Sequence, residues 1–172
     1  MTSCPRASWM CRPMIDPEEI ATLSHGTRFE ETLPTGLRWS HALLSPRLKA
    51  GDVVVDATAG NGNDTLFLIR HVLPGGRVFV FDVQSEALEQ TRKKIASHEA
   101  FISNPGSVTL IHAGHETIDM NLPIELRGRI RAFMFNLGYL PSGDKTKFTA
   151  TGTTLLALQA ASEWLADRKS VV

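Results

Sequence analysis

The stretch Val53-Val-Val-Asp-Ala-Thr-Ala-Gly-Asn-Gly-Asn-Asp64 determines the fold that we expect for this chain. Three β-branched residues in a row, between Gly-Asp and Asp, are typical of a strand that is buried on both faces of a parallel sheet. Small residues and glycines follow at once, and a helical pattern continues over 65–72. A strand, a glycine turn and a helix in this order indicate a βαβ unit, in which ligands bind at the carboxyl ends of the strands.

Apolar patterns typical of strands and of helices alternate along the rest of the chain. This alternation favours right-handed crossovers and a mostly parallel sheet with helices on both faces, so the expected fold class is α/β. A helix beginning at Ser85 has that serine as its expected cap. Further strands are expected over 77–82, 108–111 and 129–135, and helices over 36–48, 85–98 and 153–165.

The composition is that of an ordinary globular protein. The 172 residues correspond to about one domain. A hydrophobic share of 42% and a charged share of 21% exclude a largely disordered chain, a collagen and a disulfide scaffold. The formal net charge is zero, so no overall positive field favours nucleic acid, although a local patch stays an alternative. The apolar runs are far shorter than the ~20 residues that cross a bilayer, so we expect no membrane partner.

The N-terminal residues 1–32 contain several prolines without a sustained apolar period. We expect them to form a partly flexible tail ahead of a single domain over 33–172. Cys4 and Cys11 both lie in this tail and have no nearby pair of histidines, which favours free thiols over a disulfide framework or a zinc site. No continuous apolar segment indicates a secretory signal, so the cytoplasm is expected, with a short organellar presequence as the alternative.

An acidic residue stands at the end of the second expected strand. Asp82 follows Gly62 by 82 − 62 = 20 residues, the distance at which the acid of a Rossmann fold meets ribose hydroxyls. The third glycine of the dinucleotide fingerprint G-x-G-x-x-G is replaced by Thr65, so an adenosine ligand without a pyrophosphate fits better. A plain turn of a parallel sheet without any ligand is the alternative.

Two motifs resemble those of class I S-adenosylmethionine methyltransferases. Asp56-Ala-Thr-Ala-Gly-Asn-Gly62 resembles the first motif of that family, with Thr58 in place of the usual first glycine. Asn136-Leu-Gly-Tyr139 resembles the Asn/Asp-Pro-Pro-Tyr/Phe motif of its amino-directed members, with two other residues in place of the prolines. The resemblance implies a Rossmann-like methyltransferase fold in which the glycine turn lies under the methionine part of the cofactor and Asp82 holds the ribose.

The residue types after the fourth strand suit a reaction at an amine. An alkyl amine, like lysine with its pKa of about 10.4, must lose a proton before it can attack a methyl group. Asn136, a backbone carbonyl and the phenol of Tyr139 could orient the neutral amine, and Asp144 or His115 could take its proton. The alternatives are a core tyrosine, a solvated loop at Asp144 and a capping role for His115. We expect His41, His71 and His98 to be ordinary helix residues.

Four longer strings resemble one small bacterial and plastid group of these enzymes. The group was first described as rRNA methylases and includes the enzyme that methylates 5-aminomethyl-2-thiouridine at the tRNA wobble position. The strings are Asp56-Ala-Thr-Ala-Gly-Asn-Gly-Asn-Asp-Thr-Leu66, Phe81-Asp-Val-Gln84, Gly114-His115 and Met134-Phe-Asn-Leu-Gly-Tyr-Leu-Pro-Ser-Gly-Asp-Lys145. The resemblance extends over roughly residues 36 to 165.

This resemblance implies the roles of individual residues. The implied cofactor-binding residues are Asp56, Thr58, Gly60, Asn61, Gly62, Asp82, Gln84, Gly114 and His115. The implied catalytic residues are Asn136, Tyr139 and Asp144, and the implied substrate-binding residues are Leu137, Gly138, Pro141 and Lys145. No His, Cys and Asp cluster has the spacing of a metal site, so we expect none.

The expected function is S-adenosylmethionine-dependent methylation of an exocyclic amine of tRNA, namely the 5-aminomethyl group of a wobble 2-thiouridine. The alternatives are a methyltransferase of rRNA or of a small amine, and a truncated nucleotide-binding module without catalysis. The related group continues with further strands after the last helix, so the resemblance implies that the C-terminal strands of the domain are missing here. An uncovered sheet edge would favour a homodimer.

Overall fold

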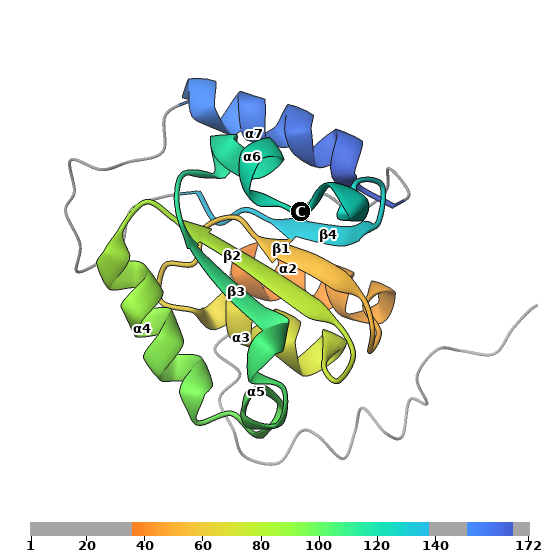
Figure 1. Ribbon diagram of the computed structural model, residues 1–172, viewed down its shortest axis with the longest axis vertical. Helices are drawn as coiled ribbons and strands as arrows, with labels where there is room; N and C mark the ends of the chain where they lie inside the picture. Colours follow the sequence, from red (N-terminus) through yellow and green to blue (C-terminus); the bar gives the residue numbers. More distant parts are fainter. Residues whose placement is uncertain (1–35, 138–150, 167–172) are drawn as a thin grey trace, which may run out of the picture. The chain divides into compact units, whose positions relative to one another are not determined.

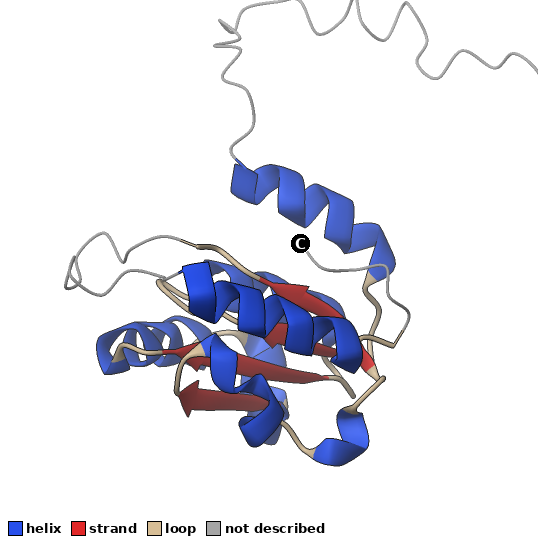
Figure 2. Cartoon of the chain, turned by 90° about the horizontal axis from the view of Figure 1, so that it is seen from above, coloured by secondary structure: helices blue, strands red, loops and turns tan. Residues whose placement is uncertain are grey.

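Four parallel strands form one sheet in the computed structural model, which describes residues 36–137 and 151–166. The strand order is β3-β2-β1-β4, and all four arrows run in the same direction in Figure 2. The strands are β1 (Val53–Asp56), β2 (Arg77–Asp82), β3 (Val108–His112) and β4 (Ile130–Met134). The chain extends the sheet from β1 to β3 on one side and then returns to place β4 on the other side of β1. The switch point of the sheet therefore lies between β1 and β4, at the edge where their carboxyl ends meet.

Helices cover both faces of this sheet (Figure 1). The α-helices are α2 (Gly36–Leu44), α3 (Asn63–Val72), α4 (Ser85–Ala96), α5 (Glu99–Ser103), α6 (Ile118–Asn121) and α7 (Thr151–Trp164). Short 3₁₀ turns are η2 (Ser45–Arg47), η3 (Pro105–Ser107), η4 (His115–Thr117) and η5 (Ile124–Leu126). Helices α2, α3 and α4 pack on one face, and α6 and α7 pack on the other.

The alternation of side chains along each strand produces these two cores. Successive residues of a strand point to opposite faces of the sheet. On β1, Val54 therefore packs toward α3, whereas Val55 packs toward α7. On β2, the valines face the first core and the phenylalanines face the second. The expected α/β class, with a parallel sheet between two layers of helices, is confirmed.

Two helix boundaries differ from those expected. The helix expected over 36–48 ends at Leu44 and continues as a 3₁₀ turn, because Pro46 has no N–H group and cannot continue an α-helix. The helix expected over 85–98 ends at Ala96, and residues 99–103 form the separate helix α5. Ser85 is not the cap, because the cap position is Gln84 and the Ser85 hydroxyl donates to Glu86.

The apolar pattern over 153–165 predicts that helix α7 turns Leu155, Leu156, Leu158, Ala161 and Leu165 toward the sheet, and the structure agrees only in part. Ala161 and Leu165 are buried, but Leu155 and Leu156 are 62% and 58% exposed. The buried residues follow a helical repeat instead and are Ala157, Ala160, Ala161 and Trp164. The small alanines let the helix approach the sheet closely, and the wholly buried indole of Trp164 fills the space at its end. The N-terminal tail and Val171-Val172 lie outside the described residues.

Candidate functional site at the carboxyl edge of the sheet

The glycine turn after β1 has one face packed on the protein and one face open. Gly62 has a φ of +71°, and a Cβ atom there would lie 2.9 Å from the Thr91 Cα. Gly60 has a φ of +50°, but the nearest atom to a Cβ there would be the Thr58 carbonyl oxygen at 3.9 Å. Packing therefore requires glycine at 62, whereas glycine at 60 leaves the turn accessible to a ligand.

Asp82, at the end of β2, joins this turn through its carboxylate. Its Oδ2 accepts a hydrogen bond from the Gly60 N–H at 2.9 Å, and its Oδ1 accepts from the Gln84 N–H at 2.9 Å. Each carboxylate oxygen can accept more than one hydrogen bond, and Asp82 is only half-buried. Asp82 can therefore still accept hydrogen bonds from a ligand, whereas the side chain of Gln84 is buried.

Asp56, at the end of β1, lies fully inside the protein beneath the turn. Its carboxylate accepts hydrogen bonds from the Thr58 N–H at 3.1 Å and from the Thr65 hydroxyl at 2.6 Å. Burial raises the pKa of Asp56 to about 7, and the nearby carboxylates of Asp64 and Asp82 act in the same direction. The side chain of Asp56 thus shapes the turn and the start of α3 from within.

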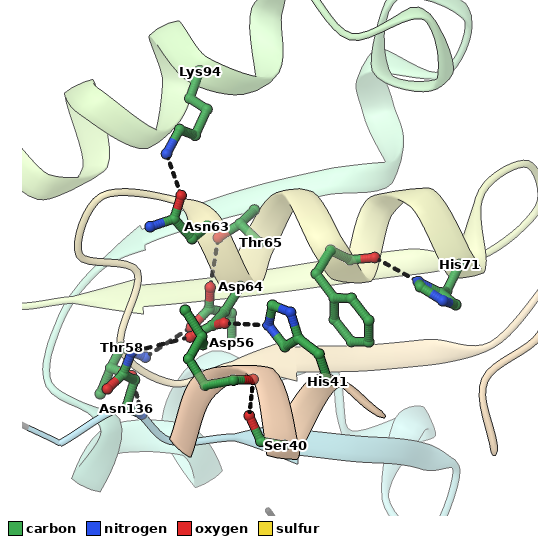
Figure 3. Close-up of polar contacts among 12 residues, drawn as sticks. Ser40, His41, Asp56, Thr58, Asn63, Asp64, Thr65, His71, Lys94 and Asn136 are labelled. Carbon is green, nitrogen blue, oxygen red and sulfur yellow. Dashed lines mark hydrogen bonds and ion pairs between the residues drawn. The ribbon is translucent and has the colours of Figure 1, made fainter. Parts of the chain in front are cut away.

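Thr58 connects the loops that follow β1 and β4. Its hydroxyl oxygen accepts a hydrogen bond from the backbone N–H of Asn136 at 2.7 Å. The side chain of Asn136 is exposed, and its Nδ2 lies 3.4 Å from Oδ2 of Asp64 (Figure 3). Thr58 stands where the first motif usually has a glycine. Its hydroxyl group therefore holds the segment after β4 that carries Asn136.

His41 also belongs to this cluster, although the sequence places it among ordinary helix residues. Its Nε2 lies 2.6 Å from Oδ1 of Asp64, and its ring stacks on Phe67 with centroids 3.9 Å apart (Figure 3). His41 lies in a helix as expected, and packing of α2 on α3 brings its side chain to Asp64, a residue 23 positions away. The one sequence signal is that His41 shares a helix face with Leu44, which is buried.

His115 has a buried nitrogen that lacks a partner. The residue is 8% exposed, and its Nε2 forms no hydrogen bond with any described residue. The ring meets that of Phe135 edge-on, with centroids 5.8 Å apart, so it lies near the end of β4. Buried polar atoms nearly always have a partner, so this nitrogen is a candidate contact for a ligand. Gly114, just before it, is buried.

Several of the expected catalytic and substrate-binding residues lie outside the part of the chain that the structure describes. They are Gly138, Tyr139, Pro141, Asp144 and Lys145. Of the residues that are described, Leu137 is 48% exposed beside Asn136, and Asn61 is exposed on the turn. Over 36–137 and 151–166, no group of three or more His, Cys, Asp or Glu residues could hold a metal ion. Within the same ranges, no helix is long and apolar enough to cross a membrane.

The described arginines near β4 lie at the opposite edge of the sheet. Arg129 and Arg131 stand at the amino end of β4, whereas Asn136 follows its carboxyl end. Arg131 lies 3.8 Å from the Asp52 carboxylate, and Arg127 pairs with Glu163. Two of the three basic side chains are therefore already engaged in ion pairs away from the site.

Comparisons with known proteins agree with this geometry. A family model described as "Putative rRNA methylase" matches residues 78–172, more than half of the chain. The chain is 36% identical over 131 residues to the chloroplastic tRNA (mnm(5)s(2)U34)-methyltransferase of Arabidopsis thaliana. This match covers 73% of the chain and 47% of that enzyme, so the chain spans about half the length of this curated relative.

Solved structures show the same architecture. A protein of Clostridium thermocellum described as a putative rRNA-methylase is 44% identical, with a TM-score of 0.69 over 78% of this chain and 68% of that one. A putative methyltransferase of Streptococcus mutans, solved in complex with SAH, is 39% identical, with a TM-score of 0.64 over 77% and 68%. The chain therefore belongs to the rRNA methylase family and has its Rossmann-like methyltransferase fold.

Proposed function

We propose that this chain is an S-adenosylmethionine-dependent methyltransferase whose cofactor lies at the carboxyl ends of β1 and β2. The observation that carries the proposal is the bond between Asp82 and Gly60, which combines an accessible acid with an open glycine turn. The relative solved with SAH supports this choice of cofactor, because SAH (S-adenosylhomocysteine) is the demethylated form of S-adenosylmethionine.

The residues present fit an adenosyl cofactor. Asp82 would accept hydrogen bonds from the ribose hydroxyls, and such bonds to a charged acceptor contribute roughly 1.5–3 kcal/mol each. The methionine part would lie along Gly60 and Asn61, where a Cβ at position 60 would come no closer than 3.9 Å to a residue other than its chain neighbours. The unpartnered Nε2 of His115 would gain a polar contact. The cofactor supplies a methyl group on a positively charged sulfur, which keeps the electron pair when the methyl group leaves.

Asn136 would receive the methyl acceptor. Its side chain stands at the switch point of the sheet, and the carbonyl oxygen of its amide can accept a hydrogen bond from an amine N–H. Such a bond aims the nitrogen lone pair at the methyl group, and positioning of this kind can supply much of the rate. The proposal keeps Tyr139 and Asp144 as further catalytic residues and Leu137, Gly138, Pro141 and Lys145 as substrate-binding residues.

The proposed acceptor is the 5-aminomethyl group of a wobble 2-thiouridine in tRNA. The Arabidopsis relative, whose name specifies a modified uridine at position 34 of tRNA, supports this choice. The family description names rRNA instead, so rRNA is the second candidate. We propose a cytoplasmic protein, with an organelle as the alternative because that relative is chloroplastic. A homodimer remains part of the proposal.

Mass spectrometry of tRNA nucleosides tests this function. The purified chain is incubated with S-adenosylmethionine and tRNA that carries 5-aminomethyl-2-thiouridine, and in a parallel reaction with unmethylated rRNA. The expected result is a gain of one methyl group on the wobble nucleoside. Asn136→Ala is expected to reduce turnover ~100-fold while the dissociation constant for SAH stays within about twofold. Methylation of rRNA alone would support the second candidate, and no methyl transfer to either RNA would contradict both.

A further inference from the structure

We propose that Asp64, held by His41, is a positioning residue that fixes which end of the Asn136 side-chain amide faces the methyl acceptor. This inference rests on the proposed function, because it specifies how the acceptor is oriented. Neither His41 nor Asp64 belongs to the site residues that the sequence motifs imply.

The carboxylate of Asp64 lies between the side chains of His41 and Asn136. It is in the first turn of α3 and is only 4% exposed. Its Oδ1 is 2.6 Å from Nε2 of His41, and its Oδ2 is 3.4 Å from Nδ2 of Asn136 (Figure 3). A carboxylate only accepts hydrogen bonds, so both neighbours must direct an N–H group at it. His41 therefore carries its proton on Nε2, and Asn136 turns its NH₂ group toward Asp64.

The orientation of the Asn136 amide has a direct chemical consequence. With the NH₂ group facing Asp64, the carbonyl oxygen Oδ1 points away from Asp64. An amine that is to be methylated carries N–H bonds and needs an acceptor for them, which Oδ1 provides. If the amide rotated by half a turn, it would present N–H groups to the amine and could no longer orient it.

Further contacts hold the main chain at Asn136 and the ring of His41. The backbone N–H of Asn136 is bonded to Thr58, so the main chain at this position is already held. On the other side of Asp64, the ring of His41 stacks nearly parallel to Phe67, at an interplanar angle of 7°. Phe67 thus holds His41, His41 holds Asp64, and Asp64 selects the amide orientation of Asn136.

Nuclear magnetic resonance of the Asn136 side chain tests the orientation without any substrate. Its NH₂ signals in a ¹H–¹⁵N spectrum are assigned by their loss in Asn136→Ala. We expect Asp64→Ala to shift these signals and to speed their exchange with water. Asn63→Ala is the matched control, because Asn63 is the neighbouring residue but its side chain bonds to Lys94. Unchanged Asn136 signals in Asp64→Ala would overturn the inference.

His41→Ala provides a second variant if Asp64→Ala does not fold. It keeps the carboxylate but removes the group that holds it, so we expect a smaller shift of the Asn136 signals in the same direction. The absence of any shift in a folded His41→Ala protein would remove His41 from the proposal.

A double-mutant cycle tests whether Asp64 acts through Asn136 during methyl transfer. Asp64→Ala is expected to lower the turnover number on tRNA that carries 5-aminomethyl-2-thiouridine about 30-fold in the wild-type background, since small misplacements of reacting groups can cost ~100-fold. In the Asn136→Ala background the same change is expected to cost less than about threefold, because the two effects are not additive when one residue acts through the other. An equal loss in both backgrounds would overturn the inference. A wild-type protein without any methyl transfer would instead contradict the proposed function, and the spectra would still decide the orientation.

Discussion

Asp56 has a pKa well above the usual value of an aspartate side chain. Its carboxyl group is completely buried, and burial raises its pKa from 3.8 to about 7. Between these two values the folded protein keeps a proton that the unfolded chain has released. The folded state therefore binds more protons than the unfolded state, and the free energy of unfolding decreases as the pH rises through this window.

We expect Asp56→Asn to remove this pH dependence. The free energy of unfolding of the wild type should decrease between about pH 4 and pH 7 by at most about 1.4 kcal/mol per pH unit, which lowers the melting temperature by roughly 3–6 °C per pH unit. An asparagine can accept from the Thr58 N–H and donate to the Thr65 oxygen, so the variant should fold with a flatter profile. The measurement is the melting temperature of both proteins across this range. Identical pH profiles would show that Asp56 does not carry the raised pKa.

At the residue scale, the sequence predicted the position of Asp82 beside the glycine turn, but it did not predict the contact between His41 and Asp64. Asp82 and the glycine turn follow a fixed spacing on adjacent strands, and the structure joins them by a direct hydrogen bond. The contact between His41 and Asp64 depends on how α2 packs on α3, which no local pattern encodes. A histidine on the buried face of a helix fits both a core role and a functional one, so its role could not be decided from sequence.

The start of α3 depends on two glycines with different roles. Gly62→Ala would place a methyl group 2.9 Å from Thr91 on α4 and would also strain a positive φ. Gly60→Ala strains its φ, but its Cβ would make only an ordinary contact with the Thr58 carbonyl oxygen at 3.9 Å. We expect Gly62→Ala to be less stable than Gly60→Ala by about 1–3 kcal/mol, the usual cost of overpacking. Denaturant unfolding of both variants measures this difference, and equal stabilities would contradict the packing argument.

Helix α7 is expected to stabilise the protein through Trp164 and not through its leucines. Trp164 is completely buried and donates a hydrogen bond from Nε1 to Asp119 on α6. Trp164→Ala should lower the free energy of unfolding by about 3–5 kcal/mol, whereas Leu155→Ala should change it by less than about 0.5 kcal/mol because Leu155 is 62% exposed. Comparable losses in the two variants would show that the exposed leucine face is covered in solution.

At the scale of elements, strands were easier to predict than the ends and faces of helices. Runs such as Val53-Val-Val55 mark a buried strand by themselves, and the structure has β1 there. The end of α2 was missed although Pro46 marks it, because the apolar spacing continues to Leu48. The buried face of α7 was predicted only in part, at Ala161 and Leu165, because the rest of its contact with the sheet is formed by alanines and Trp164 and not by Leu155 and Leu156.

The arrangement of the described strands and helices follows from their alternation along the chain. That pattern predicts a parallel sheet with two helical layers, and the strand order then places the ends of β1 and β4 at a switch point. Both halves of the proposed site join the turn after β1: the Asp82 carboxylate accepts a hydrogen bond from Gly60, and the backbone N–H of Asn136 donates one to the hydroxyl oxygen of Thr58. The site as a whole is therefore a consequence of topology, whereas its acceptor chemistry depends on individual contacts.

The central claim is that this edge of the sheet binds the adenosyl cofactor through Asp82 and leaves Asn136 for the acceptor. Calorimetric titration with S-adenosylhomocysteine of the wild-type chain, Asp82→Ala and Asn136→Ala tests it most directly. We predict binding to the wild type, a loss of affinity of about tenfold or more in Asp82→Ala, and a change within about twofold in Asn136→Ala. Equal affinities of the wild type and Asp82→Ala, or no binding to a folded wild-type chain, would contradict the account.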